Sequence, residues 1–272
     1  MITNENNFTL YWDPNFVSSQ QLWLLMIYAK IDAKLVSSSI FSGEILKKQD
    51  EDLPSGLWLP ILRDEQKASE GLMRCFNRLI DNENITALRG PTWLDGRAYN
   101  LCKKAILCED HLLLIEGEFL YQSHLRNIRK QAPFFQQGIQ DNIKAELIFN
   151  IISGRISPNA LRISLEYIHK QLTDLNEHLG YQLTLNADEF GLADILWLPV
   201  IRRLIYMDWP LKNYSELMAW YQEACHHFSA ISRLDNLERL PSRSEYGLWQ
   251  KINWLGGRNL KSSLKLMGLD TK

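Results

Sequence analysis

The sequence of 272 residues predicts a small α/β domain followed by a larger all-α domain. Strand and helix signals alternate from the N-terminus to about residue 80, whereas the part after Thr92 carries helical signals alone. Turn residues between Asp81 and Pro91 separate the two parts. We therefore expect an N-terminal domain at 1–84, an all-helical domain at 92–230 and a C-terminal extension at 231–272.

The N-terminal part has the order β-α-β, followed by a strand pair and a helix. A short β-prone run, Phe8–Trp12, ends at the turn Asp13-Pro14-Asn15. Ser18 or Ser19 is suited to cap a helix whose apolar positions recur at helical spacing. The elements expected after this helix are a strand at Ala33–Val36, a strand at Trp58–Leu62 and a helix at Ser69–Ile80.

The second part of the chain is expected to be a set of long helices. Apolar residues recur at helical spacing, and turn pairs such as Ser153-Gly154 and Ser157-Pro158 interrupt the pattern. After Ser229 the sequence is richer in Ser, Arg, Lys and Gly and only weakly periodic, which favours an extension. The helices are expected at Tyr99–Arg129, Phe135–Ile152, Pro158–Leu179, Ala193–Tyr206 and Ser215–His227.

Composition and charge exclude several functional classes. The chain has 30 Lys and Arg residues against 32 Asp and Glu residues, and a net charge of −2 gives no reason to expect a nucleic-acid-binding surface. The sequence has no apolar run of about 18 residues, so we expect no membrane span. A basic segment with an apolar core behind it is also missing at the N-terminus, so we expect a cytoplasmic protein without a secretory signal.

Common metal, redox and phosphate-binding motifs are missing as well. The four cysteines form no C-x-x-C pair and the six histidines show no H-E-x-x-H spacing, so we expect free thiols and no metal site. Neither G-x-G-x-x-G nor G-x-x-x-x-G-K-[ST] occurs. Any chemistry of this chain must therefore depend on less conspicuous residues.

Two local features are unusual. Pro60 lies within a β-prone run, although proline has no N–H for a ladder, so it is either a cis proline before a strand or an edge or loop proline. Asp194 follows Gly191 by three residues and leads into an almost wholly apolar helix. A carboxylate in this setting needs backbone donors, which a helix N-terminus supplies. We therefore expect Asp194 to be buried and to accept hydrogen bonds from N–H groups near Gly191.

In their order and spacing these residues resemble the glutathione transferase superfamily. The family has an α/β thioredoxin-like N-terminal domain with a cis-proline before its third strand, and an all-α helical C-terminal domain with a buried capping box. Leu59-Pro60 matches the cis-proline, Ser69 matches a serine that opens the next helix, and Gly191–Asp194 matches the capping box. Ser215–Tyr221 is similar to a further helix of the family. The resemblance covers residues 8–230 and implies a glutathione-transferase-like fold and a homodimer.

The resemblance also implies a group that activates glutathione. Family members place a Ser, Cys or Tyr near the loop after the first strand, where it stabilises the thiolate of glutathione. Here Phe16 and Val17 occupy that place. The candidates for the catalytic donor are Ser18, Ser19 and Asn15, while Ser18 and Ser19 are also candidates for a helix cap.

The same resemblance assigns the residues that bind the two substrates. Glutathione would be held by the backbone of Leu59, presented by Pro60, and by Ser69. Ala68 stands where the family has an acidic residue that contacts the γ-glutamyl ammonium group, so this contact is missing. The residues expected to contact a small electrophile are Phe16, His111, Tyr121 and His124.

Three functions are compatible with these residues. The first is a glutathione-dependent transferase, lyase or isomerase acting on a small electrophile or biosynthetic intermediate. The absence of the usual donor, together with Ala68, favours the second, a non-catalytic binding or assembly protein that uses the same fold. The third is an enzyme that uses the same cleft without glutathione. Fold alone does not decide among them, because unrelated functions share folds.

Overall fold

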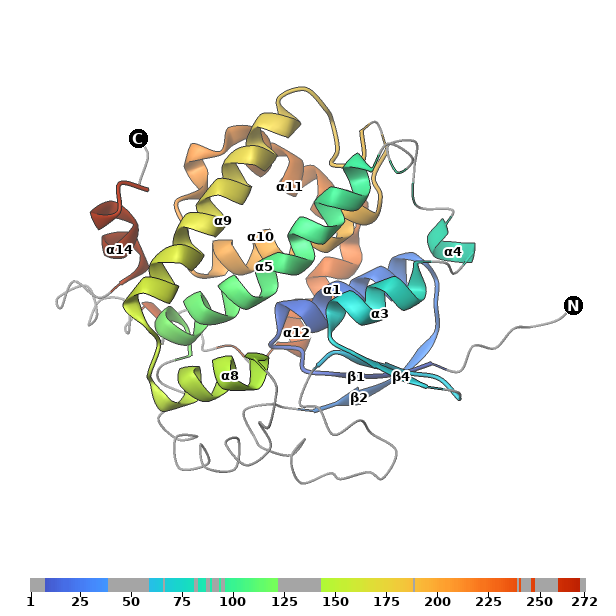
Figure 1. Cartoon of the computed structure of the whole chain (residues 1–272). Coiled ribbons are helices and arrows are strands. Elements are labelled where there is room, and N and C mark those ends of the chain that lie inside the picture. The colour runs from blue at the N-terminus through green and yellow to red at the C-terminus, as the bar shows by residue number, and fades with distance from the viewer. Residues whose placement is uncertain are drawn as a thin grey trace, which may run out of the picture.

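The computed structural model places a small sheet against a helical body (Figure 1). The described strands form a four-stranded sheet in the order β2-β1-β3-β4, in which β1 and β2 are parallel and the other two pairs are antiparallel. The strands are β1 (Phe8–Trp12), β2 (Ala33–Ser37), β3 (Ile61–Arg63) and β4 (Ala68–Glu70). The structure describes residues 8–38, 59–65, 67–80, 83–86, 89, 93, 96–121, 143–187, 189–238, 240, 246–247 and 259–269.

Helix α1 (Val17–Tyr28) connects the two parallel strands and lies with α3 (Leu72–Leu79) over one face of the sheet (Figure 1). Side chains in its first three turns are buried all round, including polar ones, because α1 also packs against the helical body. Gln21 shows how the polar groups are accommodated. Its Nε2 donates to the carbonyls of Ala105, at 3.2 Å, and Leu196, at 2.8 Å, so this buried amide joins three helices.

The Leu59–Pro60 peptide bond is cis, which confirms the prediction. Pro60 directly precedes β3, and its carbonyl accepts a hydrogen bond from the backbone N–H of Gly71 at 2.9 Å. Proline has no N–H to donate to a neighbouring strand, and at the start of a strand the hydrogen bonding of the sheet does not require one.

The helix expected from Ser69 begins later than predicted. Ala68–Glu70 form β4, paired with β3, and α3 starts at Leu72. Gly71 has a φ of 76°, a left-handed conformation that glycine adopts without steric cost, and it redirects the chain from strand to helix. The prediction of a helix N-terminus at Ser69 is wrong, because strand pairing with Ile61–Arg63 takes precedence over helical periodicity.

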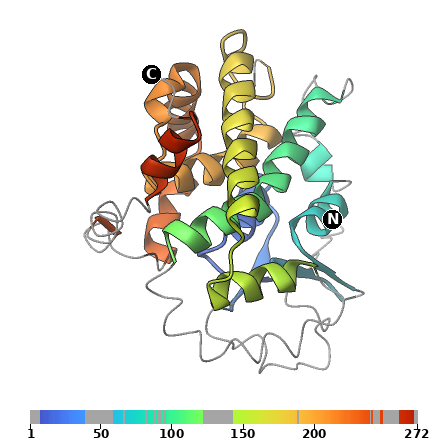
Figure 2. The same ribbon diagram turned by 60° about the vertical axis from the view of Figure 1, so that its left-hand side comes forward.

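The rest of the described chain is mainly helical, as the sequence predicts, although α5 ends at Phe119 and not at the predicted Arg129. Helix α10 is buried on almost every side between α1, α5 and α11, which explains its apolar sequence. Helix α8 lies across the N-terminal end of α9 (Figure 2). No described helix is long and apolar enough to cross a membrane. The helices are α4 (Glu83–Thr86), α5 (Arg97–Phe119), α8 (Ile143–Ser153), α9 (Pro158–Leu179), α10 (Leu192–Tyr206) and α11 (Ser215–His227), with η3 (Leu211–Asn213) before α11.

The described parts of the C-terminal region pack onto the helical body. Its elements are η4 (Ser229–Arg233), α12 (Leu234–Leu237) and α14 (Leu260–Leu266). Leu234 is fully buried, and the Tyr246 hydroxyl donates to the carbonyl of Met207, after α10, at 2.9 Å. Residues beyond 230 therefore contribute to the core, although their sequence is only weakly periodic.

Candidate functional site

The loop between β1 and α1 carries residues predicted to act on a thiol. Asp13 is fully buried, and its Oδ1 accepts hydrogen bonds from the backbone N and the side-chain Nδ2 of Asn15, both at 2.9 Å. The backbone N–H of Phe16 donates to the Asp13 carbonyl at 3.0 Å. Asp13 thus forms a turn with its own downstream backbone, a role typical of aspartate in loops, and the amide of Asn15 is part of that turn.

Ser18 and Ser19 lie in the first turn of α1, and neither caps it. The helix begins at Val17, and Phe16, in extended conformation, is its N-cap. Both serines are fully buried. Ser19 Oγ accepts a hydrogen bond from the backbone N–H of Asp13 at 3.3 Å, while Ser18 Oγ has no hydrogen-bond partner among the described residues. The capping prediction is wrong, because the helix starts before either serine.

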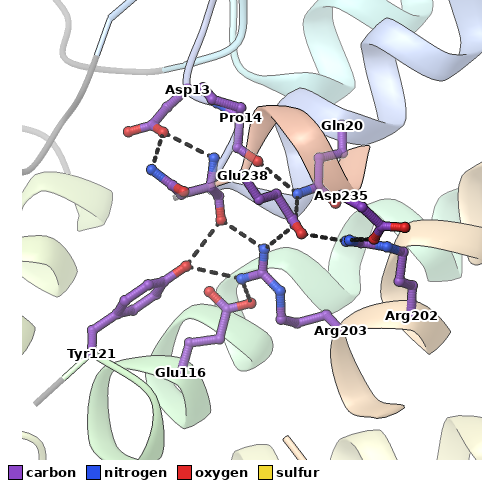
Figure 3. A network of polar contacts seen from close by, with 10 residues as sticks. Asp13, Pro14, Gln20, Glu116, Tyr121, Arg202, Arg203, Asp235 and Glu238 are labelled. Atoms are coloured by element: carbon purple, nitrogen blue, oxygen red, sulfur yellow. Dashed lines mark hydrogen bonds and ion pairs between the residues drawn. The ribbon is translucent and has the colours of Figure 1, made fainter. Parts of the chain in front are cut away.

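A buried polar network ties this loop to the helical body (Figure 3). Its centre is Arg203 on α10, whose side chain is fully buried. Arg203 Nη1 donates to Glu116 Oε1 at 2.7 Å and to the Tyr121 hydroxyl at 2.9 Å. Arg203 Nη2 donates to the Asn15 carbonyl and to Glu238 Oε1, both at 2.9 Å. The Tyr121 hydroxyl also donates to the Asn15 carbonyl at 2.9 Å, so this carbonyl receives two donors from the helical body.

Glu238 closes the network from the C-terminal side. This residue directly follows α12, and its Oε1 accepts hydrogen bonds from Gln20 Nε2 and Arg203 Nη2. Its Oε2 accepts a hydrogen bond from Arg202 Nη1 at 2.5 Å. Arg202 Nη2 in turn donates to Asp235 Oδ1 at 2.6 Å. One carboxylate therefore joins α1, α10 and the C-terminal segment.

The environment of Glu116 favours its neutral form. Burial raises the pKa of the Glu116 carboxyl to about 7, although the Arg203 guanidinium opposes that rise. Arg203 stays ionised, because the carboxylates around it raise its pKa and outweigh the effect of burial. The network is therefore sensitive to proton uptake near neutral pH at Glu116.

We expect Glu116→Gln to change how stability depends on pH. The pKa of the Glu116 carboxyl is about 7 in the folded chain, against an ordinary value of 4.5 for a glutamate in the unfolded chain. Between these two pH values the folded chain holds a proton on Glu116 that the unfolded chain has released. The contribution of Glu116 to the free energy of unfolding therefore falls as the pH rises through this window, by at most about 1.4 kcal/mol per pH unit. Glutamine cannot titrate, so the difference in unfolding free energy between wild type and Glu116→Gln should decrease from pH 5 to pH 7 in urea titrations. A difference that stays constant from pH 5 to pH 7 would contradict this.

The residues predicted to hold glutathione lie next to the sheet. Leu59 is buried and precedes the cis Pro60. Ser69 lies in β4, where its Oγ accepts a hydrogen bond from Arg78 Nη1 at 3.4 Å. Because α3 starts three residues later, Ser69 offers no N–H at a helix N-terminus. The role of Leu59 and Ser69 in binding glutathione stays a prediction.

His111 is placed away from the β1–α1 loop. On α5 it faces α9, where its Nδ1 lies 3.1 Å from Ser164 Oγ and its ring stacks on Tyr167 with 4.0 Å between the ring centroids. Burial lowers the pKa of His111, which favours the neutral imidazole in this packed position. The structure does not bring His111 together with the other candidates.

Two other candidates for contact with an electrophile do meet at the loop. Phe16 is buried at the start of α1, and the Tyr121 hydroxyl bonds to the Asn15 carbonyl next to it. Tyr121 is itself buried and bonded to Arg203, so its hydroxyl stabilises the loop. His124 lies outside the described residues.

Asp194 behaves as predicted: it is fully buried and bonded to backbone donors. Its Oδ2 accepts a hydrogen bond from the Gly191 N–H at 2.9 Å, and its Oδ1 accepts from the Leu185 N–H, at 2.9 Å, and from Trp220 Nε1, at 2.7 Å. A Cβ atom at Gly191 would lie 2.5 Å from Asn186 Nδ2. The side chain of Asn186 therefore fills the space that a capping hydroxyl would need, which explains the glycine.

Sequence reasoning missed the charged members of the network. Arg202 and Arg203 end a long apolar run, and a buried arginine requires carboxylate partners, so this pair was a usable signal. Its partners Glu116 and Glu238 are 87 and 35 residues from Arg203, and no local pattern identifies them. In the part of the chain that the structure describes, no group of three His, Cys, Asp or Glu residues is placed to hold a metal ion.

Comparison with known proteins identifies the fold. No protein-family model and no curated protein matches the sequence. Among solved structures, the chain is similar to the β-etherase LigF from Sphingobium sp. strain SYK-6, with a TM-score of 0.65 and 14% identity over 85% of this chain and 100% of that one. It is also similar to a glutathione S-transferase, unclassified 2, from Bombyx mori, with a TM-score of 0.54 and 16% identity over 90% of this chain and 98% of that one.

A plant protein shows the same likeness. Glutathione transferase F7 from Populus trichocarpa aligns with a TM-score of 0.51 and 17% identity over 84% of this chain and 98% of its own. Identities this low are informative about architecture alone, since folds are shared far more widely than activities. With its cis-proline and its buried capping aspartate, the chain has the glutathione transferase fold, a thioredoxin-like sheet domain joined to a helical domain, in a highly divergent sequence.

Proposed function

We propose that the protein is a glutathione-dependent transferase, lyase or isomerase that acts on a small electrophile. Its fold supports this, since the glutathione transferases and the β-etherase named above share it. The observation that carries the proposal is the Ser18 hydroxyl, which lies in the first turn of α1, fully buried and without a hydrogen-bond partner among the described residues.

Such a hydroxyl is suited to donate to a thiolate. A buried polar group without a partner costs about 1–3 kcal/mol, and a native structure that retains one calls for a reason. The N-terminus of a helix favours negative charge, and Ser18 lies at that end of the 12-residue α1. A thiol with a free pKa near 8.5 would be acidified there by the hydroxyl and by the helix dipole together.

The other assignments complete the proposal. Leu59 and Ser69 would bind glutathione, and the electrophile would lie near Phe16 and Tyr121, next to the β1–α1 loop. The division into 1–84, 92–230 and 231–272, a homodimer and a cytoplasmic location belong to the same proposal. For the homodimer, the support is the resemblance to the family.

One observation favours a non-catalytic binding or assembly function instead. The Asn15 carbonyl accepts hydrogen bonds from Tyr121 and Arg203, and the Asn15 amide is bonded to Asp13. These contacts use the polar groups of the loop for structure rather than for a ligand. In this second function the loop only joins the sheet to the helical body. The unpaired Ser18 hydroxyl then serves no ligand and is a small cost in stability that the fold tolerates.

Ser18→Ala separates the two functions. Under either function, the free energy of unfolding of the variant should equal that of the wild type or exceed it by up to about 1 kcal/mol, because an unpaired hydroxyl is removed. Only if Ser18 serves a thiolate should the pKa of the bound glutathione thiol rise by about one unit or more, which corresponds to about 1.4 kcal/mol of lost stabilisation of the thiolate. Urea unfolding and ultraviolet titration of the bound thiolate measure the two effects.

Ser19→Ala tests the neighbouring hydroxyl, which is itself a candidate donor but has a structural partner. It removes the acceptor of the Asp13 N–H, so it should lower the free energy of unfolding by about 1 kcal/mol.

Binding of glutathione by the wild type is tested separately. Glutathione at 100 times its Kd should raise the free energy of unfolding of the wild type by about 2.7 kcal/mol. Failure of the wild type to bind glutathione would favour the two functions without glutathione, the binding or assembly protein and the enzyme that uses the same cleft without it. An unchanged thiol pKa in Ser18→Ala would exclude Ser18 as the donor and leave Asn15 and Ser19.

A further inference from the structure

Three donors converge on one carboxylate at the base of the β1–α1 loop. Gln20 Nε2 on α1, and Arg202 and Arg203 on α10, all donate to Glu238. Gln20 and Arg203 are fully buried, and the Glu238 side chain is 4% exposed. Gln20 and Glu238 are 218 residues apart in the sequence, so it is the fold of the C-terminal segment that brings this carboxylate next to α1.

The donors that hold Glu238 also hold the loop. Gln20 Nε2 donates to the Pro14 carbonyl at 2.7 Å as well as to Glu238, and Arg203 Nη2 donates to the Asn15 carbonyl at 2.9 Å as well as to Glu238. A side chain that donates to two acceptors is fixed by both of them. Removing Glu238 therefore takes away one of the acceptors that fix the two side chains bonded to the Pro14 and Asn15 carbonyls.

From these contacts we infer that Gln20, Arg202 and Arg203 form a carboxylate-binding site and that its occupant, Glu238, positions the β1–α1 loop. The ligand class is a small carboxylate, supplied in this chain by Glu238 itself. Hydrogen bonds between ionised partners are the strong ones, and arginine is well matched to carboxylate geometry. Glu238 is thus a positioning residue for the candidate site, acting through Arg203 and Gln20.

A cavity of about 560 Å³ gives access to this site from outside. Its lining includes two charged groups of the site, Arg202 and Glu238, together with Asp235. The aromatic rings of Tyr206 and Tyr221 form part of the wall. A small carboxylic acid anion can therefore reach the place that a shortened residue 238 would leave empty.

The experiment is chemical rescue of Glu238→Ala, followed by hydrogen exchange of the full chain. This substitution removes a –CH₂–COO⁻ group, which acetate replaces. Without acetate, amides in peptides spanning residues 13–20 should exchange about tenfold faster than in the wild type, because charge-assisted bonds that restrain the loop are lost. Acetate should restore slow exchange, whereas chloride at equal ionic strength should not.

Asp235→Ala is the matched control, because Asp235 bonds to Arg202 and is more exposed. It should leave exchange in residues 13–20 unchanged, with and without acetate. Wild-type exchange in Glu238→Ala, or acceleration that acetate does not reverse, would overturn the inference. If Glu238→Ala does not fold, Glu238→Gln takes its place: it keeps the shape but not the charge, and it should also exchange faster, while wild-type exchange would overturn the inference.

The consequence for glutathione rests on the proposed function. If the wild type binds glutathione, Glu238→Ala should bind it about tenfold more weakly and acetate should restore the affinity, since a loosened loop must be ordered again on binding. Unchanged affinity would overturn the inference. If the wild type does not bind glutathione, the proposed function fails, and the exchange of residues 13–20 decides the inference by itself.

Discussion

Replacing Arg203 with leucine is expected to lower the free energy of unfolding by about 3–5 kcal/mol. The guanidinium is fully buried and is bonded to Glu116, Tyr121, Glu238 and the Asn15 carbonyl. Leucine fills part of the volume but removes the donor that Glu116 and Glu238 share, so Glu116 loses its cation and Glu238 keeps Arg202 and Gln20. A buried ionised group that loses its partner is neither hydrated nor paired. Breaking a buried ion pair therefore lowers the free energy of unfolding much more than breaking an exposed one. Urea unfolding followed by tryptophan fluorescence measures the loss.

Two further variants test this explanation. Arg203→Leu combined with Glu116→Gln and Glu238→Gln also replaces the two acids that lose Arg203, and it should be more stable than Arg203→Leu alone. Arg162→Ala breaks a 2.7 Å ion pair with Glu166 on the exposed surface of α9 and should cost less than about 1 kcal/mol. A similarly small cost for Arg203→Leu would show that the buried network contributes little to stability.

Asp194→Ala is expected to lower the free energy of unfolding by at least about 3 kcal/mol. The carboxylate accepts hydrogen bonds from the N–H groups of Leu185 and Gly191 and from Trp220 Nε1, and all three donors lose their acceptor when it is removed. Each buried donor left unsatisfied costs about 1–3 kcal/mol, and Asp194 is fully buried. Burial raises the pKa of Asp194 to about 6 against the effect of these donors, so the measurement belongs at pH 8, where the carboxylate is ionised.

Asp194→Asn gives the intermediate case. Asparagine keeps one acceptor oxygen but presents an NH₂ group where the second oxygen accepted a hydrogen bond, so its loss should be smaller than that of alanine. Asp174→Ala, which removes an exposed partner of Lys104 at 3.0 Å, should cost less than about 1 kcal/mol. If Asp194→Ala is no more destabilising than Asp174→Ala, the buried aspartate does not anchor the start of α10.

The two candidate functions differ at one group in the first turn of α1. The fold is common to both, and so is the network around Arg203, because a catalytic loop and a structural loop both need to be held. Ser18 is the point of difference, since its hydroxyl is either the donor for a thiolate or an unpaired group that serves no ligand. The thiol acidity of Ser18→Ala therefore discriminates between the two functions, and its free energy of unfolding shows that the variant keeps the fold.

Local sequence signals predicted most of the architecture. A short β-prone run closed by a turn predicted β1, and helical periodicity with clear turn residues placed α9 and α11 at their observed limits. Asp194 could be placed in the interior because its neighbours are apolar and a helix N-terminus supplies donors. These features depend on residues a few positions apart, which a sequence displays directly.

The sequence by itself therefore determined the fold class, the cis-proline position and the buried aspartate. Only the tertiary structure decided the start of α3, the cap of α1 and the partners of Arg203. At Ser69, pairing with a strand outweighed helical periodicity, and at Ser18 the entry of the chain into α1 was set by a turn around Asp13. Glu116 and Glu238 reach Arg203 from distant segments, because a buried charge selects its partners by proximity in the folded chain and not along the sequence.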